Sequence, residues 1–229
     1  MYTTMTLYHG SENIIEAPTF GVGKKNNDFG LGFYCTQSND LAKEWAVSGA
    51  KDGYSNKYTL DASYLKALNL NSPEYSILNW IAVLIEHRLF SIKTPVAQRA
   101  KKYLIDNFSV NVNAYDLVVG YRADDSYFDY AESFINNGIS VEQLAQAMRL
   151  GKLGEQIVLK SKYAFANIKF EGYELAAAEE YYIRRNTRND DANKAYLKIL
   201  EEDSDGLYIR DIIKGEIKNG DPRIPRNIS

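Results

Sequence analysis

Patterns typical of strands and of helices follow one another along the 229 residues without a regular alternation. Runs rich in aromatic and β-branched residues predict strands at residues 5–8, 33–36, 57–63, 116–121, 154–161 and 168–173. Between and after them, apolar residues at helical spacing predict helices, including a charged one beyond residue 176. A strict alternation of strand and helix would favour a doubly wound parallel sheet, so this order favours the α+β class.

Two helix starts in the middle of the chain carry the same signal. Ser72-Pro73 and Thr94-Pro95 each place a hydroxyl side chain at the cap and a proline at the first helical position. We therefore expect one helix to begin at Pro73 and another at Pro95, which makes residues 72–107 a mainly helical region. After this region, a capping box at Ser140 predicts a short helix.

Composition excludes several classes of protein. Cys35 is the single cysteine, so the chain cannot form an internal disulfide, and one cysteine with two histidines cannot build a closed Cys/His zinc site. No run approaches the roughly 18 apolar residues of a membrane helix, and no apolar run at the start resembles a signal peptide. The formal net charge of −3 gives no overall attraction to nucleic acid. We expect a cytoplasmic protein that needs no metal and does not bind membranes.

Several short motifs of well-known enzyme classes are incomplete or absent in this chain. Asp28-Phe29-Gly30 has the letters of the metal-binding triplet of protein kinases, but no lysine-bearing strand or His-Arg-Asp loop precedes it. The glycines around it do not form the dinucleotide fingerprint, and the chain lacks a Walker lysine and a G-x-S-x-G elbow. Kinase and Rossmann chemistries are therefore excluded.

Candidate polar residues lie at the ends of apolar strands. His9 follows the first strand, where an imidazole can reach a ligand hydroxyl, although an isolated histidine is more often a surface residue. Tyr34 lies in a strand preceded by glycines that admit a ligand, and its alternative is a core aromatic. Glu155 and Gln156 open a later strand and must point to opposite faces of it. The alternative for Glu155 is a solvated strand end.

The combination of motifs is more specific than any of these residues. The motifs are Tyr8-His9-Gly10-Ser11, Asp28-Phe29-Gly30-x-Gly32-Phe33-Tyr34-x-Thr36, Gly120-Tyr121-Arg122-Ala123-Asp124-Asp125 and Leu153-Gly154-Glu155-Gln156-Ile157-Val158-Leu159. Together they resemble the His-Tyr-Glu branch of the ADP-ribosyltransferase superfamily. More narrowly, they resemble an uncharacterised bacterial family with the same Tyr-His-Gly-Ser and Asp-Phe-Gly-x-Gly-Phe-Tyr pair. The resemblance covers about residues 5–175.

This resemblance implies a split, strongly bent β-sandwich that holds NAD between two small sheets. With the residue patterns above, it predicts a domain over residues 1–175 with a helical insertion at about 72–107. A charged helical extension over residues 176–229 then follows. NAD is the expected substrate, and no metal is expected.

The resemblance also implies roles for the site residues. His9 would bond a ribose hydroxyl, and Tyr34 would stack on the nicotinamide. A third residue would stabilise the positive charge that develops as the glycosidic bond breaks. The residues expected to contact the cofactor are Tyr8, Gly10, Ser11, Asp28, Phe29, Gly30, Gly32, Phe33 and Thr36.

The third residue stays open between two neighbours. Alignment with the Glu-Tyr-Ile-Val strand of poly(ADP-ribose) polymerases favours Glu155, but the bacterial family tolerates glutamine at the third position, which would make it Gln156. In that case Asp124 or Asp125 could supply the acidic group, although either of them is equally a helix cap.

The expected activity is that of a toxin-like mono-ADP-ribosyltransferase that modifies a macromolecule, with an antitoxin as a possible partner. The alternatives are a non-catalytic domain that binds NAD or a partner, and an NAD glycohydrolase. A nucleic-acid acceptor would need a local basic patch, for which Lys24-Lys25 and Arg184-Arg185 with Arg188 are the candidates. The second cluster equally suits a solvated helix face.

Overall fold

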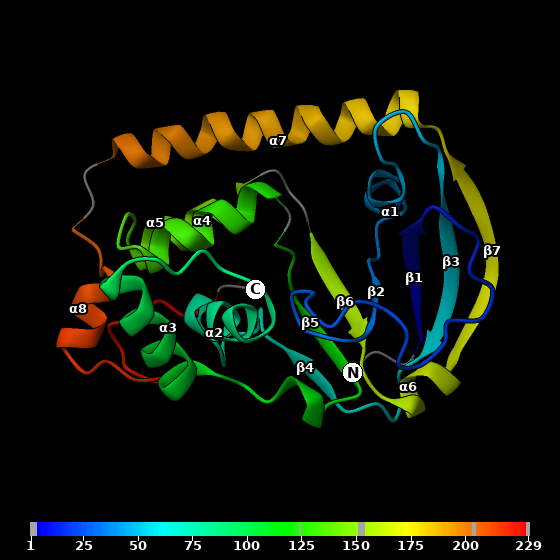
Figure 1. Ribbon diagram of the computed structural model, residues 1–229. Helices are drawn as coiled ribbons and strands as arrows, with labels where there is room; N and C mark the ends of the chain where they lie inside the picture. Colours follow the sequence, from blue (N-terminus) through cyan, green and yellow to red (C-terminus); the bar gives the residue numbers. More distant parts are fainter. Residues whose placement is uncertain (1–3, 124, 151–153, 203–204, 228–229) are drawn as a thin grey trace.

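The computed structural model describes residues 4–123, 125–150, 154–202 and 205–227. It is a mixed α+β structure with two β-sheets and a long helix near the C-terminus (Figure 1). The strands are β1 (Thr4–Ser11), β2 (Phe33–Cys35), β3 (Gly53–Asp61), β4 (Ala67–Asn69), β5 (Leu117–Tyr121), β6 (Glu155–Leu159) and β7 (Ile168–Ala176). The helices are α1 (Asn39–Ala46), α2 (Ile77–His87), α3 (Pro95–Phe108), the short 3-10 helix η1 (Val112–Ala114), α4 (Asp125–Ile135), α5 (Val141–Ala147), α6 (Lys162–Ala166), α7 (Ala178–Glu201) and α8 (Ile209–Lys214).

The two sheets pack against each other through a small apolar core. One sheet has the antiparallel order β1-β3-β7, and the other has the order β2-β6-β5-β4, in which only the β4–β5 pair is parallel. Tyr8 and Thr36 exchange backbone hydrogen bonds of 2.8 and 2.9 Å and so join β1 to the edge of the second sheet. The core between the sheets consists of Met5, Leu7, Cys35, Leu60, Leu117, Val119, Ile157, Leu159 and Ala164.

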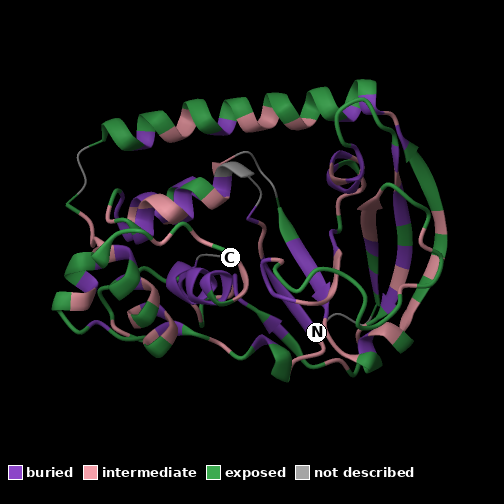
Figure 2. Cartoon of the chain, viewed as in Figure 1, coloured by how far each residue is buried: buried purple, intermediate pink, exposed green. Residues whose placement is uncertain are grey.

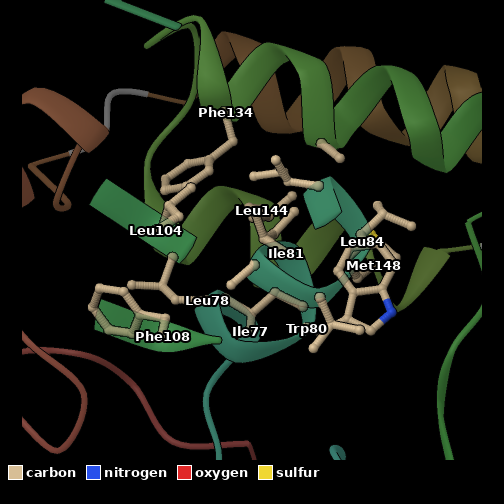
Figure 3. Packing of buried hydrophobic residues seen from close by; sticks show 14 of the residues in the cluster. Ile77, Leu78, Trp80, Ile81, Leu84, Leu104, Phe108, Phe134, Leu144 and Met148 are labelled. Atoms are coloured by element: carbon tan, nitrogen blue, oxygen red, sulfur yellow. The ribbon is translucent and has the colours of Figure 1, made fainter. Parts of the chain in front are cut away.

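The other face of the four-stranded sheet is covered by helices that enclose the main core. Helix α2 lies at its centre, and every residue from Ile77 to Ile85 is buried (Figure 2). Figure 3 shows Trp80, Leu84 and Met148 on one side of α2 and Phe108 on the other. A helix that is apolar around its whole circumference must be surrounded by protein, which explains why α3, α4 and α5 wrap it.

The starts of the two middle helices differ from each other. The prediction at Thr94-Pro95 is confirmed, since the Thr94 hydroxyl accepts a hydrogen bond from the Ala97 N–H at 3.1 Å. The prediction at Pro73 is wrong, because α2 begins at Ile77 with Ser76 as its cap. The Asn79 amide oxygen accepts from the Ser76 N–H at 2.8 Å, and this capping box sets the start one turn later.

The C-terminal part of the chain is attached to both ends of the molecule. Helix α7 runs along the top in Figure 1, from the end of β7 to the helices around α2. Near the middle of α7, Arg188 forms a hydrogen-bonded ion pair with Glu44 of α1, whose side chain is only 4% exposed. Helix α1 in turn lies directly on β1, since a Cβ atom on Gly10 would be 1.9 Å from the Ala42 carbonyl oxygen. The extension therefore supports the strand that carries His9.

None of the helices in the described ranges is both long enough and apolar enough to cross a bilayer.

We expect Arg188→Ala to lower the free energy of unfolding by roughly 3 kcal/mol, because it removes the cation that is hydrogen-bonded to the buried carboxylate of Glu44. Burial already raises the pKa of Glu44 above its ordinary value, and Arg188 opposes that rise. Urea denaturation measures the change, and Lys198→Ala on the exposed side of α7 is the matched control. A double variant, Glu44→Gln with Arg188→Met, should recover most of the loss. Equal stability of Arg188→Ala and the control would contradict this account.

Candidate functional site

The side chain of His9, on β1, connects the two sheets through its contacts with β2. Its Nδ1 lies 2.7 Å from the carbonyl oxygen of Tyr34, and its ring packs on Phe33 with centroids 4.3 Å apart. Burial lowers the pKa of His9, and the Tyr34 carbonyl opposes this effect only in part. A carbonyl oxygen accepts hydrogen bonds, so in the neutral ring Nδ1 carries the proton and Nε2 is left as an acceptor. The fold thus fixes one tautomer of His9.

A buried asparagine shapes the chain immediately after His9. The Nδ2 group of Asn56 on β3 donates to the carbonyl oxygens of His9 and Asn13 at 3.2 Å and to the Ser11 hydroxyl at 3.1 Å. Its Oδ1 accepts from the Ile15 N–H at 2.8 Å. One side chain therefore holds the turn that leaves β1.

Tyr34 is held by the glycine-rich loop that precedes it. Its hydroxyl donates to the Gly30 carbonyl at 2.5 Å and accepts from the Phe29 N–H at 3.1 Å. Burial raises the pKa of Tyr34 far above its ordinary value, so the phenol keeps its proton. The ring is partly buried and packs against the main core.

The strand register places the candidate residues on two faces of the four-stranded sheet. Tyr34 is opposite Val158, so its side chain shares the helix-covered face with Val158 and Gln156. Glu155 points to the other face, the one that looks toward the three-stranded sheet. The Phe33 ring, on which His9 packs, is on that face as well. The expected alternation of Glu155 and Gln156 is thus present.

Gln156 belongs to a buried polar network. Its Nε2 donates to Asp28 Oδ2 at 2.8 Å and to the Tyr121 carbonyl at 2.9 Å. Asp28 Oδ2 also accepts from the Ala123 N–H at 2.8 Å, and Oδ1 lies 3.3 Å from a guanidinium nitrogen of Arg88. Burial raises the pKa of Asp28, while these hydrogen bonds and Arg88 favour its charged form. With 3% of Gln156 exposed, its amide is committed to the protein and closed to a ligand.

Glu155 has the opposite surroundings. It is exposed, and its Oε1 accepts a hydrogen bond of 2.8 Å from Nδ2 of Asn71, which follows β4. Among the described residues no salt bridge engages Glu155, and its exposed carboxylate is accessible to a ligand. Of the two candidates for the third residue, Glu155 is therefore the accessible one.

The remaining predicted contact residues serve the local structure. Gly30 has φ +73°, and a Cβ atom there would lie 2.3 Å from His87, while one on Gly32 would lie 2.5 Å from Val158. The space beside these two glycines is thus filled by protein. Phe29 is fully buried in the main core, and the Ser11 hydroxyl is bonded to the Asn13 carbonyl.

Asp124 lies outside the described residues, as does Leu153 of the last motif. Asp125 is the first residue of α4.

Sequence reasoning missed several residues that position this region. Asn56, Asn71, Arg88 and Lys160 come from β3, the turn after β4, the end of α2 and the end of β6. Lys160 donates from Nζ to the carbonyl oxygens of Phe29 and Leu31 at 2.6 and 2.8 Å. No short motif links these four residues, because only the tertiary structure brings each of them to its partner: Asn56 to the turn after β1, Asn71 to Glu155, and Arg88 and Lys160 to the loop before β2. The one local signal is an asparagine in an otherwise strand-like run at residue 56.

Within the described ranges, no group of three or more His, Cys, Asp and Glu side chains is arranged to hold a metal ion.

The chain belongs to the family described as "Protein of unknown function (DUF3990)", whose model matches residues 5–170. This range ends at the third residue of β7 and leaves α7 and α8 outside. No curated protein and no solved structure matches the chain.

Substitutions at Glu155 and at Gln156, the two candidates for the third site residue, should differ in their effect on stability. We expect Gln156→Ala to lower the free energy of unfolding by about 1–3 kcal/mol, because it removes two hydrogen bonds and takes one donor from a buried carboxylate. Glu155→Gln should change it by less than about 0.5 kcal/mol, since the side chain is exposed. Denaturant unfolding of both variants measures the difference. A Gln156→Ala protein as stable as Glu155→Gln would show that the buried network does not stabilise the fold.

Proposed function

We propose that this protein is an NAD-dependent mono-ADP-ribosyltransferase that transfers ADP-ribose to a macromolecule. The bond between nicotinamide and C1′ of the ribose breaks, and its electron pair leaves with neutral nicotinamide. An acceptor nucleophile bonds to C1′ and loses a proton. The observation that carries the proposal is the hydrogen bond between His9 and the Tyr34 carbonyl, since it joins the two motif residues and leaves Nε2 as an acceptor.

The position of β2 supports a ligand that contacts residues on both faces of its sheet. β2 is the edge strand in the order β2-β6-β5-β4, and His9 of the other sheet lies beside it. A dinucleotide that crosses this edge can meet His9 on one side and the ring of Tyr34 on the other. His9 Nε2 then accepts from a ribose hydroxyl, and the Tyr34 ring stacks on nicotinamide.

Glu155 lies on the face of the sheet that bears Phe33 and His9, opposite the Tyr34 ring, so in this proposal it approaches the ribose from the His9 side as charge develops. As the glycosidic bond breaks, positive charge appears on the ribose, and an accessible carboxylate stabilises it. Asn71 holds one carboxylate oxygen, which reduces the freedom of the side chain before the reaction. Gln156 keeps a structural role in this scheme.

The acceptor and the biological setting rest on the family resemblance. A toxin-like role, with an antitoxin as partner, follows from that resemblance, and the acceptor is protein or nucleic acid. Labelled NAD incubated with cell extract and then treated with protease or nuclease distinguishes the two acceptors. Nicotinamide release without labelled macromolecule would instead indicate an NAD glycohydrolase, and NAD binding without release a non-catalytic domain.

We expect Glu155→Gln to lower kcat for nicotinamide release by about 100-fold, because it removes the charge and keeps the size of the side chain. KM for NAD should change much less, since the charge on the ribose develops only in the transition state. Glu179→Gln, an exposed glutamate on α7, is the matched control. Equal kcat values for the two variants would remove Glu155 from the reaction, and a parent protein that releases no nicotinamide with any extract would refute the proposed function.

We expect kcat/KM to be constant at neutral pH and to fall in acid as His9 is protonated and its Nε2 stops accepting a hydrogen bond. Because burial lowers the pKa of His9, the fall lies below its ordinary value of 6.5. The free energy of unfolding should fall in the same direction. The stabilisation that neutral His9 contributes is complete above pH 6.5 and is lost as the pH falls through the pKa of His9 in the folded state. Profiles of kcat/KM and of unfolding from pH 4.5 to 8 test this against His9→Gln.

Both proteins share the titration of Asp28, so the difference between their profiles isolates His9. Parallel profiles would contradict the role given to its imidazole.

A further inference from the structure

Lys160 places a charged group in the loop that holds Tyr34. It follows β6 directly, and its ammonium group donates to the Phe29 and Leu31 carbonyls at 2.6 and 2.8 Å. In Figure 1 this loop, drawn in blue before β2, crosses the strands β5 and β6. Gly32 allows the close approach, since a Cβ atom there would lie 3.3 Å from the Lys160 side chain and 2.9 Å from the Leu159 carbonyl.

The charge of Lys160 has no counter-charge in the described part of the structure. Its side chain is partly buried, its two partners are neutral carbonyls, and no carboxylate of the described residues pairs with it. Burial lowers the pKa of Lys160 to about 8, which means that the folded state disfavours its charge. An apolar side chain of similar length would avoid this cost. The ammonium group therefore serves the loop more than it serves the core.

The two carbonyl groups that Lys160 binds lie on either side of the Gly30 carbonyl, which binds the Tyr34 hydroxyl. The Tyr34 hydroxyl bonds to the Phe29 N–H and to the Gly30 carbonyl, and Lys160 binds the Phe29 and Leu31 carbonyls. Phe29 is thus held at both its N–H and its C=O. A shift of the loop would move both hydrogen-bond partners of the phenol, so the position of the Tyr34 ring depends on Lys160.

We propose that Lys160 is a positioning residue of the NAD site, which fixes the loop of residues 29–31 and through it the plane of the Tyr34 ring. This proposal rests on the proposed function. A ring that must stack on nicotinamide gains from being fixed before the ligand arrives, because small displacements of reacting groups are costly.

The first test compares Lys160→Met and Lys160→Arg with the matched control Lys162→Met, whose side chain is exposed. We expect Lys160→Met to unfold at or above the temperature of the parent and yet to lose on the order of tenfold to 100-fold in kcat/KM for NAD. Lys160→Arg keeps a charged donor and should recover most of the activity. A loss of activity that matches the control, or that occurs only with a loss of stability, would overturn the proposal.

The second test is the pH profile between pH 7 and 10. In the parent, kcat/KM should fall above about pH 8 as the ammonium group loses its proton. This alkaline limb should be absent in Lys160→Met and in Lys160→Arg, whose guanidinium stays charged. The ionisable groups on the elements around the loop are Asp28, Tyr34, His87, Arg88, Asp116 and Lys162, and all three proteins share them. An alkaline limb that persists in both variants would overturn the proposal.

A measurement without NAD separates this proposal from the proposed function. Hydrogen exchange of residues 28–34 reports directly on the loop and on the backbone of Tyr34. If the parent releases no nicotinamide, the proposed function fails, and exchange then decides the role of Lys160. Faster exchange in Lys160→Met than in Lys162→Met supports its hold on Tyr34, and equal exchange refutes it.

Discussion

The arrangement of the site depends on the hydrogen bonds and the ion pair of one buried carboxylate, that of Asp28. It receives hydrogen bonds from Gln156 on β6 and from the backbone after β5, and an ion pair from Arg88 at the end of α2. A charged group at this depth persists only when its oxygens are bound, so three elements must meet at one residue of a loop. The loop between β1 and β2 is thereby fixed to the four-stranded sheet. Because that loop also binds the Tyr34 hydroxyl, the network sets the position of the aromatic ring as well.

The local patterns of the sequence predict six of the seven described strands near their observed positions, whereas the three-residue β4 is too short to carry a pattern. The alternation in residues 155–159 predicted that Glu155 and Gln156 would point to opposite faces, and the register with β2 and β5 agrees. The α+β class followed from the order of the patterns and is confirmed by the two sheets. The start of α2 was predicted one turn too early, because Ser72-Pro73 carries the usual cap signal while Ser76 and Asn79 form the actual capping box. Two competing caps four residues apart differ by too little for sequence alone to rank them.

The site was predictable only as far as its motifs extend. Because side chains alternate along a strand, the sequence indicates that Glu155 and Gln156 point to opposite faces of the sheet. It does not indicate which face the helices cover. The helices cover the face of Gln156, which is why Gln156 is buried and Glu155 is exposed. The partners of the motif residues come from the turn after β4, the end of α2 and the end of β6, at sequence separations that no local pattern reports. Gly30 and Gly32 show the same limit. Their expected purpose was to admit a dinucleotide, while their neighbours are His87 and Val158, so the glycines also allow the loop to pack against the protein itself.

The part of the chain beyond residue 170 has a practical consequence for any attempt to produce the family-matched segment alone. Ile199, Ile209, Ile212, Ile217 and Ile224 are all part of the main core, and Ala178 and Tyr181 cover the end of α1. A fragment cut at residue 170 would uncover apolar surface on α2, α3 and α5 and remove the cation that faces Glu44. Such a fragment is expected to aggregate during expression, because exposed apolar patches of this kind promote association. The range over which the family can be detected in sequence is therefore shorter than the unit that folds.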